Sequence, residues 1–126
     1  MTATPFAARR AVVLFGHGSR DPLWCLPMEA VAARMSGRQP ELAVRCAYLE
    51  LTEPDLAGVV AEMAAGSVGS ITVVPMFLGV GRHAREDLPR LIEQLRLQYP
   101  AVAFTLRRAI GEDERVLDLL ARISLE

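Results

Sequence analysis

Short runs of apolar residues alternate along this chain with segments in which apolar residues recur every three or four positions. The runs are continuous and partly β-branched, which is typical of strands covered on both faces. They span residues 11–15, 42–49, 70–76 and 101–106. The periodic segments predict helices over about residues 22–36, from 52 to Gly66, from about 87 to Pro100, and from Gly111 onwards.

This alternation of strands and helices predicts an α/β fold. The connections are short, so we expect a parallel sheet with helices on both of its faces. A doubly wound, flavodoxin-like sheet of four parallel strands most often has the order 2-1-3-4. No linker or low-complexity stretch interrupts the pattern. We therefore expect an N-terminal leader over residues 1–10 and a single domain over residues 11–126.

Local signals indicate where the helices begin. Thr52 has an acidic residue three positions later and resembles a capping box at the start of the second helix. Asp87 and Pro89 predict the start of the third helix, because proline is tolerated in a first turn. The fourth helix carries an apolar stripe made of Val116, Leu120 and Ile123.

Composition excludes several classes of function. The formal net charge of −1 provides no basic footprint for nucleic acid. All 14 cationic side chains are arginine, so Schiff-base chemistry through lysine is impossible. No apolar stretch approaches the roughly 20 residues that span a bilayer, and the first one is too short for a signal-peptide core. We expect a cytoplasmic protein that binds neither nucleic acid nor a membrane, with Cys25 and Cys46 as small buried residues.

The two histidines of the chain both follow a predicted strand. His17 stands between two glycines after the first strand, and His83 follows the glycines after the third. With strand one between strands two and three, His17, Glu50 and His83 should meet at the carboxyl edge of the sheet. Two imidazoles and a carboxylate are a common ligand set for divalent first-row metals. The alternatives are hydrogen-bonded structural histidines and, for Glu50, a solvated residue or a helix cap.

The segment between the third strand and His83 is glycine-rich. Glycine removes the side chain, which favours close approach of the backbone to a flat or bulky ligand. A phosphate cradle is the competing interpretation, but the segment lacks the Lys-Ser/Thr pair and is too short for a dinucleotide fingerprint. Three arginines flank the histidines and favour a ligand rich in carboxylates or phosphates, unless they are simply solvated: Arg20, Arg82 and Arg85.

Three segments together resemble a known family. They are Phe-Gly-His-Gly-Ser-Arg-Asp-Pro over residues 15–22, Leu-Glu-Leu-Thr-Glu-Pro over residues 49–54, and Val-Pro-Met-Phe-Leu-Gly-Val-Gly-Arg-His-Ala-Arg-Glu-Asp-Leu-Pro over residues 74–89. They are similar to the class II tetrapyrrole chelatases, in particular the short, single-domain sirohydrochlorin chelatases of the CbiX type. The resemblance extends from about residue 11 to 123.

The resemblance implies a chelatase-like domain that inserts a divalent metal into sirohydrochlorin without a nucleotide. Co²⁺ is the first expectation for the metal, with Ni²⁺ or Fe²⁺ as alternatives. It implies that His17 holds the metal and acts as the base, that His83 is the second ligand, and that Glu50 assists metal or substrate binding. Chelation expels two pyrrole protons, a task that suits imidazole. A homodimer with paired clefts is also implied.

The resemblance further implies which residues contact the macrocycle. The loop Leu78, Gly79, Val80, Gly81, Arg82 is expected to lie against it, and Ser19, Arg20 and Arg85 are expected to bind the substrate as well. Met76 and Phe77 either join the apolar wall or pack in the core. A non-catalytic tetrapyrrole or metal carrier with the same fold and ligands remains the alternative. A flavin or phosphate binder would show no dependence on histidine.

Overall fold

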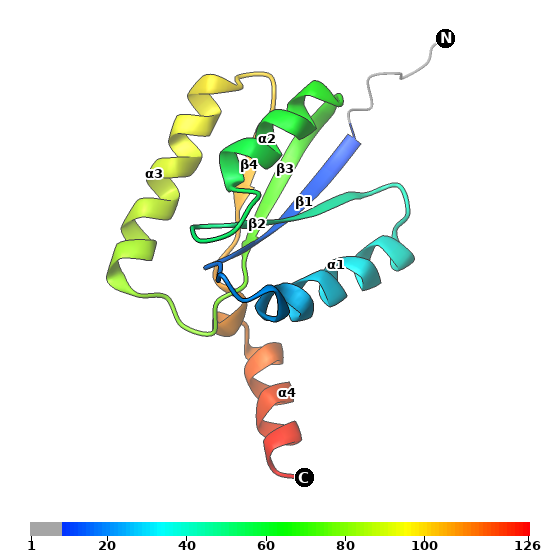
Figure 1. The fold of residues 1–126 in the computed structure, drawn as a ribbon, viewed down its shortest axis with the longest axis vertical. Coiled ribbons are helices and arrows are strands. Elements are labelled where there is room, and N and C mark those ends of the chain that lie inside the picture. The colour runs from blue at the N-terminus through cyan, green and yellow to red at the C-terminus, as the bar shows by residue number, and fades with distance from the viewer. Residues whose placement is uncertain (1–8) are drawn as a thin grey trace.

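Four parallel strands form the centre of the molecule (Figure 1). The structure is a computed structural model and describes residues 9–126, except for the side chain of His83. The strands are β1 (Arg9–Gly16), β2 (Ala43–Tyr48), β3 (Val68–Pro75) and β4 (Ala103–Leu106). Their order is β2-β1-β3-β4, which confirms the predicted topology. β1 begins two residues before the predicted domain boundary, and residues 1–8 of the expected leader lie outside the described part.

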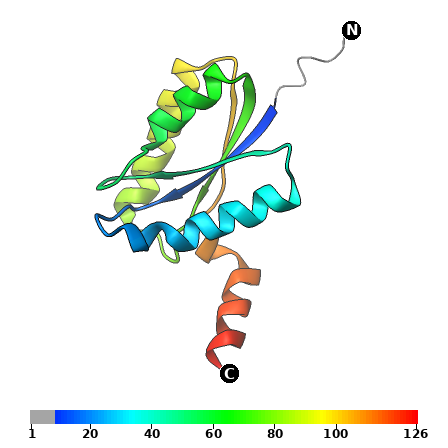
Figure 2. The same cartoon turned by 45° about the vertical axis from the view of Figure 1, so that its right-hand side comes forward.

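Helices lie on both faces of this sheet, as predicted (Figure 2). One face is covered by α1 (Leu26–Arg38), which follows the short 3-10 helix η2 (Pro22–Cys25). The other face is covered by α2 (Leu56–Ala65) and α3 (Arg82–Gln98). After β4 come the 3-10 helix η3 (Ile110–Glu112) and α4 (Glu114–Ser124). Within residues 9–126, no helix has both the length and the apolar character needed to cross a membrane.

Alternation along β1 divides the buried side chains between two cores. Val13 and Phe15 point into the larger core, beneath α2 and α3, while Leu14 points into the smaller one, beneath α1. Successive side chains of a strand face opposite sides of the sheet, so a continuous apolar run is required to fill both cores. The centre of the sheet is therefore packed on both of its faces.

All four helix starts differ from the sequence-based expectation, and the fourth helix begins at Glu114, after η3, and not at Gly111. The second helix is capped by Asp55, whose carboxylate accepts a hydrogen bond from the backbone N–H of Gly58 at 2.8 Å, so the predicted Thr52 cap is wrong. The third helix starts at Arg82, not near residue 87, and Pro89 lies inside it. The first α-helix starts at Leu26, after a 3-10 turn at the expected position. Proline marks a helix boundary only statistically, because packing against the sheet can hold a helix through it.

The fourth helix projects away from the sheet (Figures 1 and 2). Its expected stripe exists, but Leu120 is 40% exposed and Ile123 is 55% exposed. Amphipathic periodicity indicates that one face of a helix is apolar, but it does not indicate which other part of the protein covers that face.

Candidate functional site

The turn after β1 places His17 beside Glu50. The backbone N–H of Glu50 donates to the carbonyl of His17 at 3.1 Å, and the N–H of Leu49 donates to that of Gly16 at 2.9 Å. Gly18 has a φ of 96°, and a Cβ on it would lie 1.8 Å from the carbonyl oxygen of Glu50. Only glycine fits there, because both the left-handed backbone and the close approach exclude a side chain. The His17 and Glu50 side chains are both exposed at the carboxyl edge of the sheet.

The imidazole of His17 stacks on the ring of Phe77. The ring centroids are 4.3 Å apart, with an angle of 29° between the planes. Phe77 is 4% exposed and also meets Phe15 edge-on, with centroids 6.1 Å apart. Of the two interpretations of Phe77, the structure favours core packing. Its ring packs against one face of the imidazole. The sequence pattern did not suggest this role, because the two residues are 60 positions apart.

A pocket opens beside His17, between the end of β1 and the first turns of α3. Its volume is about 280 Å³. The lining is mostly apolar and comprises Phe15, His17, Leu49, Phe77, Gly81, Arg82, Ala84, Asp87, Leu88 and Leu91. Three predicted site residues therefore meet here: His17, Gly81 and Arg82. A mostly apolar pocket with a few converging polar groups is the usual form of a small-molecule site.

His83 is the second residue of α3, and not part of a loop before it. Its side chain lies outside the described part of the structure. The residues on either side of it, Arg82 and Ala84, line the pocket, so the backbone at this position borders the same space as His17. Among the side chains that the structure describes, no three histidine, cysteine or acidic groups gather at one point. The predicted ligand set of His17, His83 and Glu50 stays a prediction.

Asp87 was missed as a site residue because the sequence pattern assigned it to the start of the helix. With α3 beginning at Arg82, Asp87 lies four residues after His83 and thus on the same side of the helix. It lines the pocket with His17. An acidic residue four positions after a histidine is a recognisable signal, but only once both residues are known to be helical.

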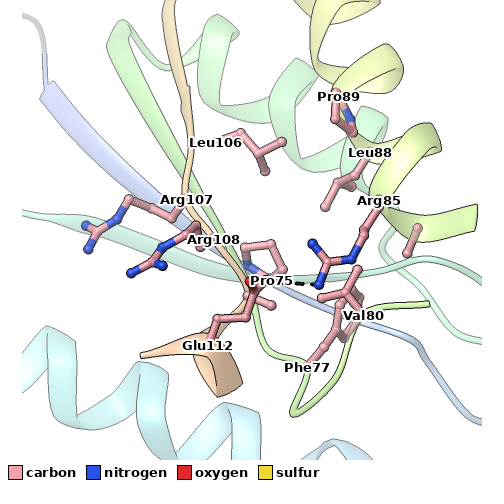
Figure 3. A pocket seen from close by; sticks show the side chains of 12 residues that line it. Pro75, Phe77, Val80, Arg85, Leu88, Pro89, Leu106, Arg107, Arg108 and Glu112 are labelled. Atoms are coloured by element: carbon pink, nitrogen blue, oxygen red, sulfur yellow. Dashed lines mark ion pairs between the residues drawn. The ribbon is translucent and has the colours of Figure 1, made fainter. Parts of the chain in front are cut away.

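Two other predicted residues line a neighbouring pocket of about 220 Å³ (Figure 3). Val80 is half-buried there, and Arg85 faces Glu112 across it, with 3.8 Å between guanidinium nitrogen and carboxylate oxygen. Arg107 and Arg108 lie on the other side of this pocket. The two pockets share Phe77, Ala84 and Leu88 as a common wall. Arg85 therefore belongs to a basic rim next to the His17 pocket.

The remaining predicted residues lie in the loops after β1 and β3. Ser19 accepts a hydrogen bond from the backbone N–H of Asp21 at 3.0 Å, and Arg20 is exposed. Gly79 has open space around it, and Leu78 is 69% exposed. These loops surround the site, but none of these four residues lines either of the two pockets described above.

Exposed apolar side chains also lie at the carboxyl edge of the sheet. They come from three connections, after β1, β2 and β3 respectively: Leu23 and Trp24, Leu49 and Leu51, and Leu78. Each is at least 45% exposed. Apolar side chains grouped on a surface commonly mark a binding site. The sequence pattern did not single out Leu23 and Trp24, because a lone apolar residue in a turn carries no periodic signal.

Comparison with known proteins identifies similar sequences over nearly the whole chain. The model of the CbiX family matches residues 11–125. A sirohydrochlorin cobaltochelatase of Methanococcoides burtonii is 24% identical over 123 residues, covering 91% of this chain and 94% of the relative. A sirohydrochlorin ferrochelatase of Bacillus subtilis is 32% identical over 113 residues, covering 86% of this chain but 42% of the relative.

Solved structures show the same fold. The CbiX protein from Marinobacter aquaeolei VT8 superimposes with a TM-score of 0.79 at 35% identity, over 92% of this chain and 93% of that one. The sirohydrochlorin chelatase SirB from Bacillus subtilis subspecies spizizenii, in complex with cobalt, gives a TM-score of 0.69 at 26% identity. That alignment covers 90% of this chain and 49% of SirB.

Proposed function

Because the chain belongs to the CbiX family, we propose that it is a sirohydrochlorin chelatase, an enzyme of the lyase class that inserts a divalent metal ion into the macrocycle. The observation that carries the proposal is the position of His17. Its imidazole is exposed on a turn between two glycines at the carboxyl edge of the sheet, and it lines a mostly apolar pocket. Relatives that match the chain are named for cobalt or iron insertion into this substrate.

The chemistry needs a base and metal ligands at one place. A divalent ion replaces two pyrrole N–H protons, so each turnover releases two protons from the ring. We assign His17 as a ligand that hands over the metal and as an acceptor of a pyrrole proton, since neutral imidazole does both. The carboxylate of Glu50 projects from the backbone segment bonded to that of His17 and can assist with either task. We assign His83 as the second ligand.

The substrate's shape and charge suit the surroundings of His17. The apolar edge that includes Trp24, Leu49 and Leu78 offers contact area to a flat ring. Exposed arginines can pair with the carboxylates around the ring: Arg20 from the loop after β1, and Arg82 and Arg85 from the first turn of α3. The metal is a second substrate, with Co²⁺ as first candidate and Ni²⁺ or Fe²⁺ as alternatives, because all three accept nitrogen and oxygen ligands.

Further expectations complete the proposal. We propose that no nucleotide is consumed and that the enzyme works in the cytoplasm. Cys25 and Cys46 are free thiols, as a reducing compartment favours. We expect a homodimer with paired clefts, and neither nucleic acid nor a membrane as a partner.

One assay tests the activity. Purified protein is mixed anaerobically with sirohydrochlorin and Co²⁺, without ATP, and the absorbance of the macrocycle is followed. We expect acceleration over the protein-free rate, and the same assay with Ni²⁺ and Fe²⁺ ranks the metals. Binding of the macrocycle without any acceleration would instead identify the carrier function. The control is Leu97→Asp, because Leu97 is 83% exposed near the far end of α3.

A further inference from the structure

The pocket next to the one that His17 lines carries a surplus of positive charge. Its volume is about 220 Å³. The charged side chains that line it come from α3 and from the segments after β4: Arg85, Arg107, Arg108 and Glu112 (Figure 3). The loop between β3 and α3 borders both pockets, since Val80 lines this one and Gly81 lines the other. A flat ring that lies on this loop can therefore extend over both pockets.

Two of these arginines have no carboxylate partner among residues 9–126. Arg85 faces Glu112 at 3.8 Å, and Asp113 pairs with another arginine at 2.7 Å. Arg107 and Arg108 form no ion pair within the described residues, and both are exposed. Figure 3 shows their guanidinium groups extending to the same side, away from that of Arg85. Two guanidinium groups without a partner at one place favour an anionic ligand, and carboxylate fits their planar geometry.

The backbone fixes both arginines at the carboxyl edge of the sheet. The N–H of Arg107 donates to the carbonyl of Val73 at 2.9 Å, so pairing with β3 continues beyond the end of β4. Further along, the N–H of Gly111 donates to the carbonyl of Phe77 at 2.9 Å. A Cβ on Gly111 would come within 2.0 Å of a carbonyl oxygen in the loop after β3, so this contact requires glycine. The segment that carries the two arginines is thus held at both of its ends.

We propose that Arg107 and Arg108 bind carboxylate arms of the tetrapyrrole and thereby select a macrocycle with acidic side chains. This inference rests on the proposed function, because it needs the ring to lie over the pocket of His17. Arms on one side of the ring then extend past the loop between β3 and α3 and meet the two guanidinium groups. Arginine holds a carboxylate by two parallel charge-assisted hydrogen bonds, which an esterified or alkyl arm cannot form. The pair contacts no reacting atom, so it acts on the affinity for the substrate and not on metal insertion.

Steady-state kinetics with sirohydrochlorin and Co²⁺ test the role of the pair. In the double variant Arg107→Gln, Arg108→Gln, the KM for the macrocycle should rise about 10-fold with little change in kcat, because exposed charge pairs contribute modestly. The difference from the wild type should shrink to about 2-fold or less in concentrated salt, which screens exposed charges. Replacing both arginines with lysine keeps the charge and should restore most of the affinity. The matched control is Arg9→Gln, Arg10→Gln, which alters an exposed pair at the amino end of β1.

Binding of the metal-free macrocycle separates this inference from the proposed function. The ring should quench the fluorescence of Trp24, the only tryptophan of the chain, so affinity is measured without turnover. A wild type that binds the ring without inserting metal would refute the chelatase activity, while the double variant still tests the arginines; a wild type that does not bind it would refute both. An unchanged affinity in the double variant, or an equal loss in the control, would overturn the inference alone. Inorganic phosphate that raises the melting temperature of the wild type only, with the affinity for the ring unchanged, would identify a site for free anions instead.

Discussion

Replacing Gly18 with alanine tests whether the turn that carries His17 is held by its contact with the loop after β2. Two costs add. Alanine in the left-handed conformation that Gly18 adopts, with a φ of 96°, is disfavoured by about 1–2 kcal/mol. The new methyl group would also sit 1.8 Å from the carbonyl oxygen of Glu50, and such overlap typically costs ~1–3 kcal/mol after relaxation.

A small gain opposes these costs. Alanine has fewer backbone conformations than glycine in the unfolded chain, which raises the free energy of unfolding by about 0.4–1 kcal/mol. The net loss for Gly18→Ala is therefore about 1–4.5 kcal/mol, and the melting temperature should fall by roughly 3–18 °C for a domain of this size. To relieve the overlap, the turn after β1 must move away from Glu50. Because this movement also displaces His17, the chelatase rate should fall as well. Calorimetry and the anaerobic Co²⁺ assay measure the two effects.

Gly37→Ala is the matched control. Gly37 lies inside α1, and a Cβ there meets nothing within 4 Å. The helix should gain about 0.5–1 kcal/mol, with unchanged activity. If Gly18→Ala melts within about 2 °C of the wild type and stays fully active, the contact between the two loops does not hold the site, and the reasoning fails.

Three further predictions follow from the site and its surroundings. His17→Ala should lower the turnover rate by about 100-fold or more while leaving the melting temperature nearly unchanged, because the side chain is exposed. Full activity of the variant would contradict the assignment. Phe77→Leu should lower the free energy of unfolding by only about 1 kcal/mol but reduce the turnover rate, because the ring that stacks on the imidazole is lost. If only the stability changes, Phe77 is a core residue without influence on the site. Burial, followed by the charge of Glu29, raises the pKa of the Cys46 thiol to about 12. The folded state thus keeps a proton that the unfolded state loses above about pH 8.5, so stability should fall by ~1 kcal/mol between pH 7.5 and 9.5, and urea titrations should show a shallower fall for Cys46→Ala.

Several features of the fold were predictable because they depend on local patterns. Continuous apolar runs and intervening periodic segments predict strands and helices in the observed order, and short connections impose parallel pairing. The order of the strands then places the turns after β1 and β2 side by side. That is why His17 and Glu50 were expected as neighbours, and their backbones are in fact hydrogen-bonded.

The start of α3 was not predictable from local signals. Pro89 is disfavoured inside a helix, so the pattern placed it in a first turn, whereas the helix extends from Arg82 through it. Burial of Leu88, Ile92 and Leu95 against the sheet outweighs the lost hydrogen bond. This difference moves position 83 from a loop into a helix and brings Asp87 into the pocket.

By itself, then, the sequence determined the elements, their order in the sheet and the edge at which His17 and Glu50 lie, because periodicity and short connections are local properties. Only the tertiary structure decided that Phe77 lies under His17, that Gly18 packs on the carbonyl of Glu50, and that α4 runs away from the sheet. Each of these is a contact, or a missing contact, between residues distant in the chain. Such contacts depend on how whole elements pack, and no local pattern encodes them.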